Sequence, residues 1–510
     1  MKKILSILLF SFLWCNISFA QSMLDDFAKW LHDNGHYQYL NFDKTLYKAI
    51  AKNKKDPLTS IAGTHNNSKA TAKVNAMEAC ELIHKAQGKE MQKACYIHSV
   101  NKVIDICERE PKYSEVWVYN RCDEFRGTTN LNLKISKKKW TLPEEASPNF
   151  DTLLYYFFKY QHAHFVPGSR TYQWDTYEAK PSSQHYKFKS DLKVDKYIKK
   201  QMNKTALLSY LLYEDGKITV DKISPKDRFG NFVNNETRLR SMSIGKTMVS
   251  YVMGHAICKG YIDSVDNRLN DWSLIKNTLY ENQKIIDLLN MNAGDQKYVN
   301  RSNFKDGSGV SIDDLTTLRT MNKMINLKKS KSQYNYNALL PHLLLNYISF
   351  KSGDDFENLL KDIFQNEAQI QQSVFFMKYK NSKKEEGIAN SMFFATRYDY
   401  LRIAKSMLHD WQNDTCMGKY LKTIYKNKIS KGNFNQRFDL SNTFSGTKTY
   451  AGFFHTDYSG MKKRSIMGMS GYGDQEIIID FDRSRILVIH SIHGNYNWKK
   501  IAYSVIKKGK

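Results

Sequence analysis

The sequence has 510 residues, of which 41% are hydrophobic and 13% aromatic, and its formal net charge is +26. This length is too great for one average core and predicts two or three domains. The hydrophobic content excludes an intrinsically disordered chain, which would be too poor in apolar residues to bury a core.

The first 20 residues have the pattern of a secretory signal peptide. Lys2 and Lys3 precede the apolar run "ILSILLFSFLW", and Ser18-Phe19-Ala20 ends that run with small residues around a cleavage site. The run is too short to span a bilayer comfortably. We therefore expect an exported bacterial protein, periplasmic or secreted, with no transmembrane segment after signal removal.

The positive charge raises nucleic acid or an anionic surface as partners. However, the 77 Lys and Arg residues are scattered along the chain, and the longest run of lysines is only 137–139. We therefore expect no specific nucleic-acid partner. A cationic surface-binding protein stays open as an alternative, and it predicts binding that weakens steeply with salt.

Cysteine usage suits an exported protein, which can keep disulfides. Four cysteines fall in one short region with a repeated spacing: Cys80, Cys95, Cys107 and Cys122. Four cysteines permit three pairings, and the sequence does not choose among them. Cys258 and Cys416 lie far apart in the chain, and we expect them to be buried and unpaired.

Residues 23–125 are expected to form a small cysteine-containing α+β module with a helix followed by two strands. Residues 126–190 are expected to be a connecting segment, because "TLPEEASPNF" and "VPGSR" carry turn and breaker residues. Neither stretch contains a recognisable catalytic pattern.

Residues 191–510 form the third predicted region. The order of elements is a helix near 191–205, a hairpin at 206–223 with an Asp-Gly turn, a helix from 243, two strands at 475–492 and a final amphipathic helix. Strands at both ends with helices between them predict an α+β fold, an antiparallel sheet flanked by helices.

The helix that begins near 243 carries the strongest chemical signal. Its sequence "SMSIGKTMVSYVMGHAIC" is apolar nearly all round, yet Ser243 and Lys246 lie one turn apart at its start. A serine hydroxyl is a weak nucleophile unless a neighbouring base takes its proton, and a lysine can do so when its amine is partly neutral. The helix N-terminus favours a developing oxyanion.

With these residues the sequence resembles the class C β-lactamase-related serine hydrolases, which include penicillin-binding-protein-like and 6-aminohexanoate oligomer hydrolase branches. The likeness covers about residues 190–510. Four stretches carry it: "LRSMSIGKTMVSYVMGHAICKGYI", "IIDLLNMNAGD", "YNYNALLPHLLLNYISFKSG" and "IMGMSGYGDQEIIIDFDRSRILVI". The resemblance implies a β-lactamase/transpeptidase-like fold.

The resemblance also implies site residues. The third stretch would carry the catalytic tyrosine, for which Tyr334 and Tyr336 compete, and the distance to Ser352-Gly353 favours Tyr336. Asn337 would then lie at the substrate. At the position where β-lactamases have the motif Lys-Thr-Gly, residues 469–471 are Met-Ser-Gly. Because the lysine is missing, we do not expect a substrate carboxylate to be bound as it is in a β-lactamase.

The implied mechanism is hydrolysis of an ester or amide bond through an acyl-enzyme on Ser243, with Lys246 and Tyr336 as proton carriers. The backbone N–H groups of Ser243 and Tyr472 would form the oxyanion hole. Asn337, Ser470 and Gly471 would contact substrate. No metal or cofactor is expected, and His490 and His493 do not form a zinc-ligand pattern.

The substrate class stays open among small esters, amides and peptides, as does the oligomeric state. The alternative is a catalytically silent binding protein of the cell envelope that keeps the β-lactamase fold, because the third motif lacks its lysine.

Overall fold

The computed structural model describes residues 174–508, apart from 231, 302–303, 306–311, 313–314, 380–381 and 433–441. Before residue 174 it describes five short strands and the single residues Ala76, Met77, Cys80, Leu153 and Phe157. The signal peptide expected over 1–20, Cys107 and Cys122 lie outside the described residues.

The chain divides into two compact units, residues 1–172 and 173–510. The first contains a three-stranded antiparallel sheet, ordered β2-β1-β3. It also contains a short two-stranded sheet. The strands are Tyr47–Asn53 (β1), Ser60–His65 (β2), Cys95–Val100 (β3), Lys134–Ile135 (β4) and Trp140–Thr141 (β5). Cys80 is disulfide-bonded.

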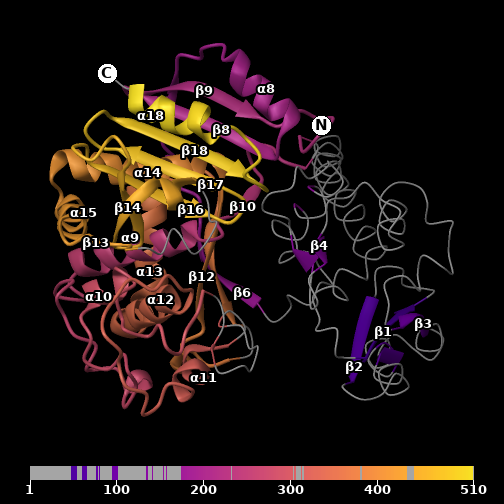
Figure 1. Ribbon diagram of the computed structural model, residues 1–510, viewed down its shortest axis with the longest axis vertical. Helices are drawn as coiled ribbons and strands as arrows, with labels where there is room; N and C mark the ends of the chain where they lie inside the picture. Colours follow the sequence, from indigo (N-terminus) through magenta and orange to yellow (C-terminus); the bar gives the residue numbers. More distant parts are fainter. Residues whose placement is uncertain are drawn as a thin grey trace, which may run out of the picture. The chain divides into compact units, whose positions relative to one another are not determined.

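The second unit is built on a nine-stranded sheet, ordered β13-β14-β15-β16-β17-β18-β8-β9-β7 (Figure 1). Its strands are Ile429–Ser430 (β13), Thr447–Ala451 (β14), Phe454–Tyr458 (β15), Ile466–Gly471 (β16), Gln475–Asp480 (β17), Arg485–Ser491 (β18), Leu207–Glu214 (β8), Lys217–Ile223 (β9) and Lys189–Ser190 (β7). Neighbouring strands are antiparallel except β7 and β9, which are parallel. The hairpins predicted at 206–223 and 475–492 are β8–β9 and β17–β18.

A second sheet has four antiparallel strands, ordered β10-β12-β11-β6. They are Arg238–Arg240 (β10), Ala389–Thr396 (β12), Val374–Tyr379 (β11) and Trp174–Ala179 (β6). Strands β6 and β7 lie within the stretch expected to be a connecting segment, and the structure pairs them with strands of the second unit.

Helices cover both faces of the nine-stranded sheet. The longer helices of the unit are Lys196–Lys204 (α8), Ile244–Cys258 (α9), Leu339–Ser352 (α12), Arg397–Asn413 (α14) and Cys416–Lys426 (α15); the shorter ones are Ile285–Leu289 (α10), Thr317–Asn322 (α11), Phe356–Lys361 (α13), Asn442–Gly446 (α17) and Ser504–Lys508 (α18). Helix α8 packs on β8 and β9 and α14 on β17 and β18, whereas α12 and α13 pack on α9 and the four-stranded sheet. Side chains alternate across a strand, so Ile489 of β18 packs with α8 and α18. His490 points the other way, against Tyr400 of α14. These layers confirm the predicted α+β class.

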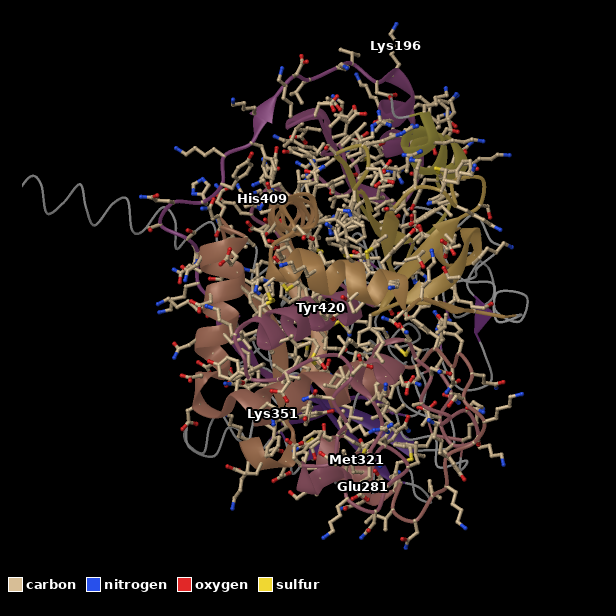
Figure 2. The ribbon with its side chains drawn as sticks, turned by 90° about the vertical axis from the view of Figure 1, so that its left-hand side faces the viewer. Lys196, Glu281, Met321, Lys351, His409 and Tyr420 are labelled. Atoms are coloured by element: carbon tan, nitrogen blue, oxygen red, sulfur yellow. A yellow bond between two sulfur atoms is a disulfide. The ribbon has the colours of Figure 1, made fainter. Side chains whose placement is uncertain are left out.

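Helix α9 lies in the middle of the unit, as its apolar sequence predicts. It packs against α12, α15 and β12, and 13 of its residues are buried. Tyr420 of α15 points into this core (Figure 2) and shares a hydrogen bond of 2.9 Å with Ser250 of α9. None of the helices among the described residues combines the length and apolar composition that a membrane span requires.

The expectation that Cys258 and Cys416 are buried and unpaired is wrong, because Cys416 is exposed and the two are bonded to each other. They form a disulfide between the last residue of α9 and the first residue of α15, with their Cα atoms 5.8 Å apart. The two cysteines are separated by 158 residues in sequence. Only the packing of the two helices brings them together, and sequence spacing does not report it.

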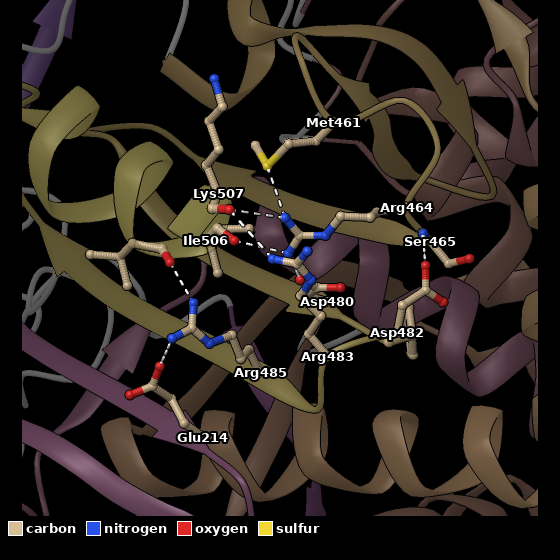
Figure 3. A network of polar contacts seen from close by, with 12 residues as sticks. Glu214, Met461, Arg464, Ser465, Asp480, Asp482, Arg483, Arg485, Ile506 and Lys507 are labelled. Atoms are coloured by element: carbon tan, nitrogen blue, oxygen red, sulfur yellow. Dashed lines mark hydrogen bonds and ion pairs between the residues drawn. The ribbon is translucent and has the colours of Figure 1, made fainter. Parts of the chain in front are cut away.

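The C-terminal helix is clamped by three arginines (Figure 3). Arg464 donates to the carbonyl of Ile506 (2.8 Å), Arg485 donates to that of Val505 (2.5 Å) and Arg483 donates to that of Lys507 (3.4 Å). The last carbonyls of a helix have no intrahelical partner and carry partial negative charge. The guanidinium groups donate hydrogen bonds to these carbonyls and bring a positive charge next to them, and they thereby attach α18 to the sheet.

Candidate active site

The chain enters the candidate site from β10 and turns sharply into α9. Met242 has a φ of 48°, a left-handed conformation that is uncommon for non-glycine residues. Before it, the N–H of Ser241 donates to the carbonyl of Phe393 in β12 (2.8 Å), and its hydroxyl accepts from the N–H of Phe393 (3.0 Å). These bonds fix the turn that presents Ser243 at the start of the helix.

The hydroxyl of Ser243 bonds to a lysine instead of capping the helix. A serine at this position usually accepts from an N–H of the first turn, but Ser243 makes no side-chain cap bond. Lys246 Nζ donates to Ser243 Oγ at 2.9 Å. Lys246 is buried in the first turn of the 15-residue helix α9, and Ser243 directly precedes that helix.

Tyr336 lies against the same ammonium group. The Nζ of Lys246 is 5.0 Å from the centroid of the Tyr336 ring. Tyr334 packs instead on the ring of Tyr450, with centroids 5.1 Å apart. Of the two tyrosines that the sequence left in competition, Tyr336 therefore has the geometry of a partner for Lys246.

The segment around Tyr336 is held by a buried aspartate. Asp295 accepts hydrogen bonds from Asn335 Nδ2 (2.7 Å), Asn337 Nδ2 (3.2 Å) and Tyr280 OH (2.9 Å). Burial raises the pKa of Asp295, and these hydrogen bonds oppose that shift. Asn335 and Asn337 flank Tyr336, so the network fixes the backbone on both sides of the tyrosine.

The expectation that Asn337 binds substrate does not fit this placement. Asn337 is fully buried. Its Oδ1 accepts from the N–H groups of Leu339 and Leu340 at the start of α12 (3.0 and 3.1 Å), while its Nδ2 donates to Asp295 and to the carbonyl of Asn335. Its amide therefore caps a helix and holds a turn.

The end of β16 approaches the start of α9. A Cβ atom added at Gly471 would lie 2.7 Å from the carbonyl oxygen of Ser241, so only glycine permits this close approach. The next residue, Tyr472, is among the exposed aromatic residues. Ser470 is buried on the strand opposite Glu476, and Met469 is fully buried. Gly471 and Tyr472 are thus near the turn before Ser243.

Two basic residues near this centre were not found by sequence reasoning. His455 of β15 is buried, and Lys431 Nζ lies 3.3 Å from its Nδ1. Burial, then the charges of Lys431 and Lys246, lower the pKa of His455 well below its usual value. The local signal was weak, because a single lysine or histidine in a basic chain has no pattern that marks it.

Taken together, the side chains offer a nucleophile, a hydrogen-bonded amine and a phenol at one helix N-terminus. Such a set is suited to nucleophilic catalysis, because the amine and the phenol can carry the proton of the serine. Among the described residues no group of three or more His, Cys, Asp or Glu side chains is arranged to hold a metal ion.

No protein-family model matches the chain, and no curated protein matches its sequence. Among solved structures, it is similar to a candidate 6-aminohexanoate-dimer hydrolase from Bacillus anthracis (13% identity, TM-score 0.46, 66% of this chain and 88% of that one). It is also similar to the octameric penicillin-binding protein homologue from Pyrococcus abyssi (16%, 0.44, 61% and 75%) and to a class C β-lactamase from Rhodobacter sphaeroides (12%, 0.41, 59% and 94%). These names fall within the family that the sequence motifs resemble. At TM-scores of 0.41 to 0.46 they establish no shared activity.

Proposed function

We propose that this chain is an exported serine hydrolase that cleaves an ester or amide bond through an acyl-enzyme on Ser243. The observation that carries the proposal is the 2.9 Å hydrogen bond from Lys246 Nζ to Ser243 Oγ at the start of a buried helix. Burying an ammonium group costs free energy, so a lysine without a specific role is expected on a solvated face of its helix. Lys246 is instead buried beside the serine hydroxyl.

In the first step, Ser243 Oγ attacks the carbonyl carbon of the substrate. The O–H bond of the serine breaks as the new C–O bond forms, and the proton passes to the neutral amine of Lys246, either directly or through the phenol of Tyr336, which gives up its own proton as it accepts this one. The same groups return the proton to the leaving alcohol or amine as its bond to the carbonyl carbon breaks. The result is an acyl-enzyme and a released first product.

The tetrahedral intermediate needs donors for its oxyanion. We assign this function to the backbone N–H groups of Ser243 and Tyr472, because Gly471 brings the end of β16 against the turn before Ser243. One such donor contributes roughly 3–4 kcal/mol to transition-state stabilisation in serine hydrolases. Water then attacks the acyl-enzyme with the same proton carriers, and the second product is an acid.

The substrate class consists of small esters, amides or peptides. Met469 brings neither charge nor a strong hydrogen bond to the strand beside the site, and it is fully buried. Ser470 and Gly471 remain the proposed contacts of the strand with substrate. Asn337 is no longer one, because its amide is used within the protein.

A fluorophosphonate probe tests the proposal, since it labels serine hydroxyls that are activated as nucleophiles. The second-order labelling rate is measured for wild type, Ser243→Ala, Lys246→Met and Tyr336→Phe. We expect no labelling of Ser243→Ala and a loss of at least roughly a hundredfold for Lys246→Met, the scale typical of general-base removal.

Lys259→Met is the matched control for the lysine. Lys259 directly follows the same helix and forms an exposed ion pair with Asp362, so its loss should leave the labelling rate unchanged. A wild-type protein that is folded by circular dichroism but is not labelled would contradict the hydrolase proposal and favour the silent binding protein.

A further inference from the structure

Lys431 is a buried lysine whose hydrogen-bond partners among the described residues include no acid. It follows β13 and is almost completely inaccessible to solvent. Its Nζ donates to the carbonyl of Phe444 (2.7 Å) and to Thr447 Oγ1 (2.6 Å), and it lies 3.3 Å from His455 Nδ1. Among the described residues no carboxylate forms an ion pair with it. Burial, then the charge of exposed Lys448, lower the pKa of Lys431 well below its usual value.

The hydrogen bonds of Lys431 are compatible with both of its protonation states. Thr447 donates its own hydroxyl hydrogen to the carbonyl of Thr443 (2.7 Å), so its oxygen accepts from Lys431. An ammonium group has three donors, and here they match the Phe444 carbonyl, Thr447 Oγ1 and the bare Nδ1 of His455. A neutral amine has two hydrogens for the oxygens and a lone pair that accepts from Nδ1–H of His455.

The proton on Lys431 therefore determines the tautomer of His455. When Lys431 is charged, His455 carries its hydrogen on Nε2; when Lys431 is neutral, His455 carries it on Nδ1. Burial, then the charges of Lys431 and Lys246, keep the imidazole itself neutral, because they lower the pKa of His455. One proton on the lysine thus changes which edge of the histidine is a donor.

This pair is linked to the candidate site through two aromatic rings. The ring of His455 contacts Phe444 (centroids 4.5 Å apart) and Tyr450 (5.0 Å). The ring of Tyr336 contacts the same two residues, at 4.9 and 6.2 Å. His455 and Tyr450 are directly opposite each other on β15 and β14. Tyr336 and the pair therefore share one packed ring cluster.

We propose that Lys431 and His455 are positioning residues of the Ser243 centre. Lys431 fixes the tautomer of His455, and the two together set the charge and the ring packing next to Tyr336. The inference rests on the proposed function, because it concerns the phenol that exchanges protons with Ser243. The titratable groups that surround the pair among the described residues are Lys246, Tyr336, Lys448 and Tyr450.

The test is the pH dependence of fluorophosphonate labelling between pH 5 and pH 10. Lys431→Met removes the buried charge and the bond to His455, and we expect labelling to slow about tenfold, the equivalent of one charge-assisted hydrogen bond, with a changed pH profile. Lys426→Met is the matched control, because Lys426 is exposed at the end of α15 and does not shift the pKa of Lys431 or His455; it should leave the profile unchanged. His455→Asn keeps an acceptor for Lys431 and removes Nε2, so its profile should also change.

Two results separate this inference from the proposed function. If wild type is labelled on Ser243 and folded Lys431→Met has the same rate and pH profile, the positioning proposal is overturned and the hydrolase proposal stands. If folded wild type is not labelled at any pH, both fail.

A second measurement uses the unaltered chain, in case Lys431→Met does not fold. Nuclear magnetic resonance of 15N-histidine-labelled wild type reports which ring nitrogen of His455 carries the hydrogen, with His455→Asn to assign the signal. We expect the hydrogen to move from Nε2 to Nδ1 as the pH rises. A tautomer that stays the same over this pH range would overturn the coupling.

Discussion

Asp295 accepts a hydrogen bond of 2.7 Å from Asn335, the residue directly before Tyr336. It also accepts one from Asn337, directly after the tyrosine. The carboxylate is fully buried, so its role is to hold the segment and not to meet solvent. The position of the proposed proton carrier is thus determined by hydrogen bonds that Asp295 accepts from its two neighbours in sequence.

Asp295→Ala should therefore affect both stability and reactivity. It removes the acceptor of the Tyr280 hydroxyl and one of the two acceptors of each asparagine amide, and each buried unsatisfied donor costs about 1–3 kcal/mol. We expect a clear loss in the free energy of unfolding, measured with urea, and slower fluorophosphonate labelling of the folded fraction. Asp271→Asn is the control, because Asp271 forms a partly exposed ion pair with Lys351, and such pairs contribute only about 0–1 kcal/mol. Equal effects of the two substitutions would contradict the role of Asp295.

Gly471→Val should block the site while the fold persists. The Cβ atom would lie 2.7 Å from the carbonyl of Ser241, so β16 must move away from the turn that precedes Ser243. We expect labelling to fall by at least roughly tenfold, as when one oxyanion donor is displaced. Lys463→Val introduces the same side chain at an exposed position in the turn before β16 and should leave the labelling of Ser243 unchanged. Labelling of Gly471→Val at the wild-type rate would show that the strand end is not part of the site.

The disulfide between Cys258 and Cys416 should stabilise the second unit. It closes a long loop between two packed helices, and disulfides that close loops of this length contribute about 3–5 kcal/mol in the chain-entropy model. The double variant Cys258→Ser/Cys416→Ser should unfold at lower urea concentration than wild type under oxidising conditions. Adding a reductant should bring wild type toward the double variant and leave that variant's second-unit transition unchanged. Identical transitions of wild type and the double variant without reductant would argue against the disulfide.

Glu476 should make stability depend on pH. Burial raises its pKa to about 8, while hydrogen bonds from Thr443 and Trp498 oppose the shift. The group's ordinary value is 4.5, so the folded state holds a proton that the unfolded state releases. Its stabilising contribution is therefore complete below about pH 4.5 and is lost as the pH rises toward about 8.

Glu476→Gln replaces the carboxyl by a neutral group of the same shape and removes this dependence. Thermal unfolding of wild type should occur at lower temperature as the pH increases from 5 to 8, and the slope should be smaller in Glu476→Gln. The same slope in both proteins would show that Glu476 does not titrate in this range.

The elements that were predicted from sequence are those with local signals. The hairpin β8–β9 turns at Asp215 and Gly216, both with positive φ, and the Asp-Gly pair marks such a turn. Helix α9 was found from its apolar composition and from Ser243 and Lys246, which are one turn apart. In each case the residues that interact are close to each other in sequence, so the local sequence pattern is sufficient to predict their contact.

The features that were missed depend on contacts between distant residues. The partner of Asn337 in its buried network, Asp295, is 42 residues away, and the family pattern alone assigned that amide to substrate. The disulfide joins residues that are 158 positions apart. Lys431 is one of 77 Lys and Arg residues, and only tertiary packing distinguishes it, because the fold buries its ammonium group beside a carbonyl, a hydroxyl and His455.

The most direct test of the account is to identify the residue that a fluorophosphonate modifies in the wild-type protein, by mass spectrometry of its peptides. The account predicts a single adduct, on the peptide that contains Ser243, with the modification on that serine. A folded protein without an adduct, or an adduct on another residue while Ser243 stays unmodified, would contradict the claim that Ser243 is an activated nucleophile.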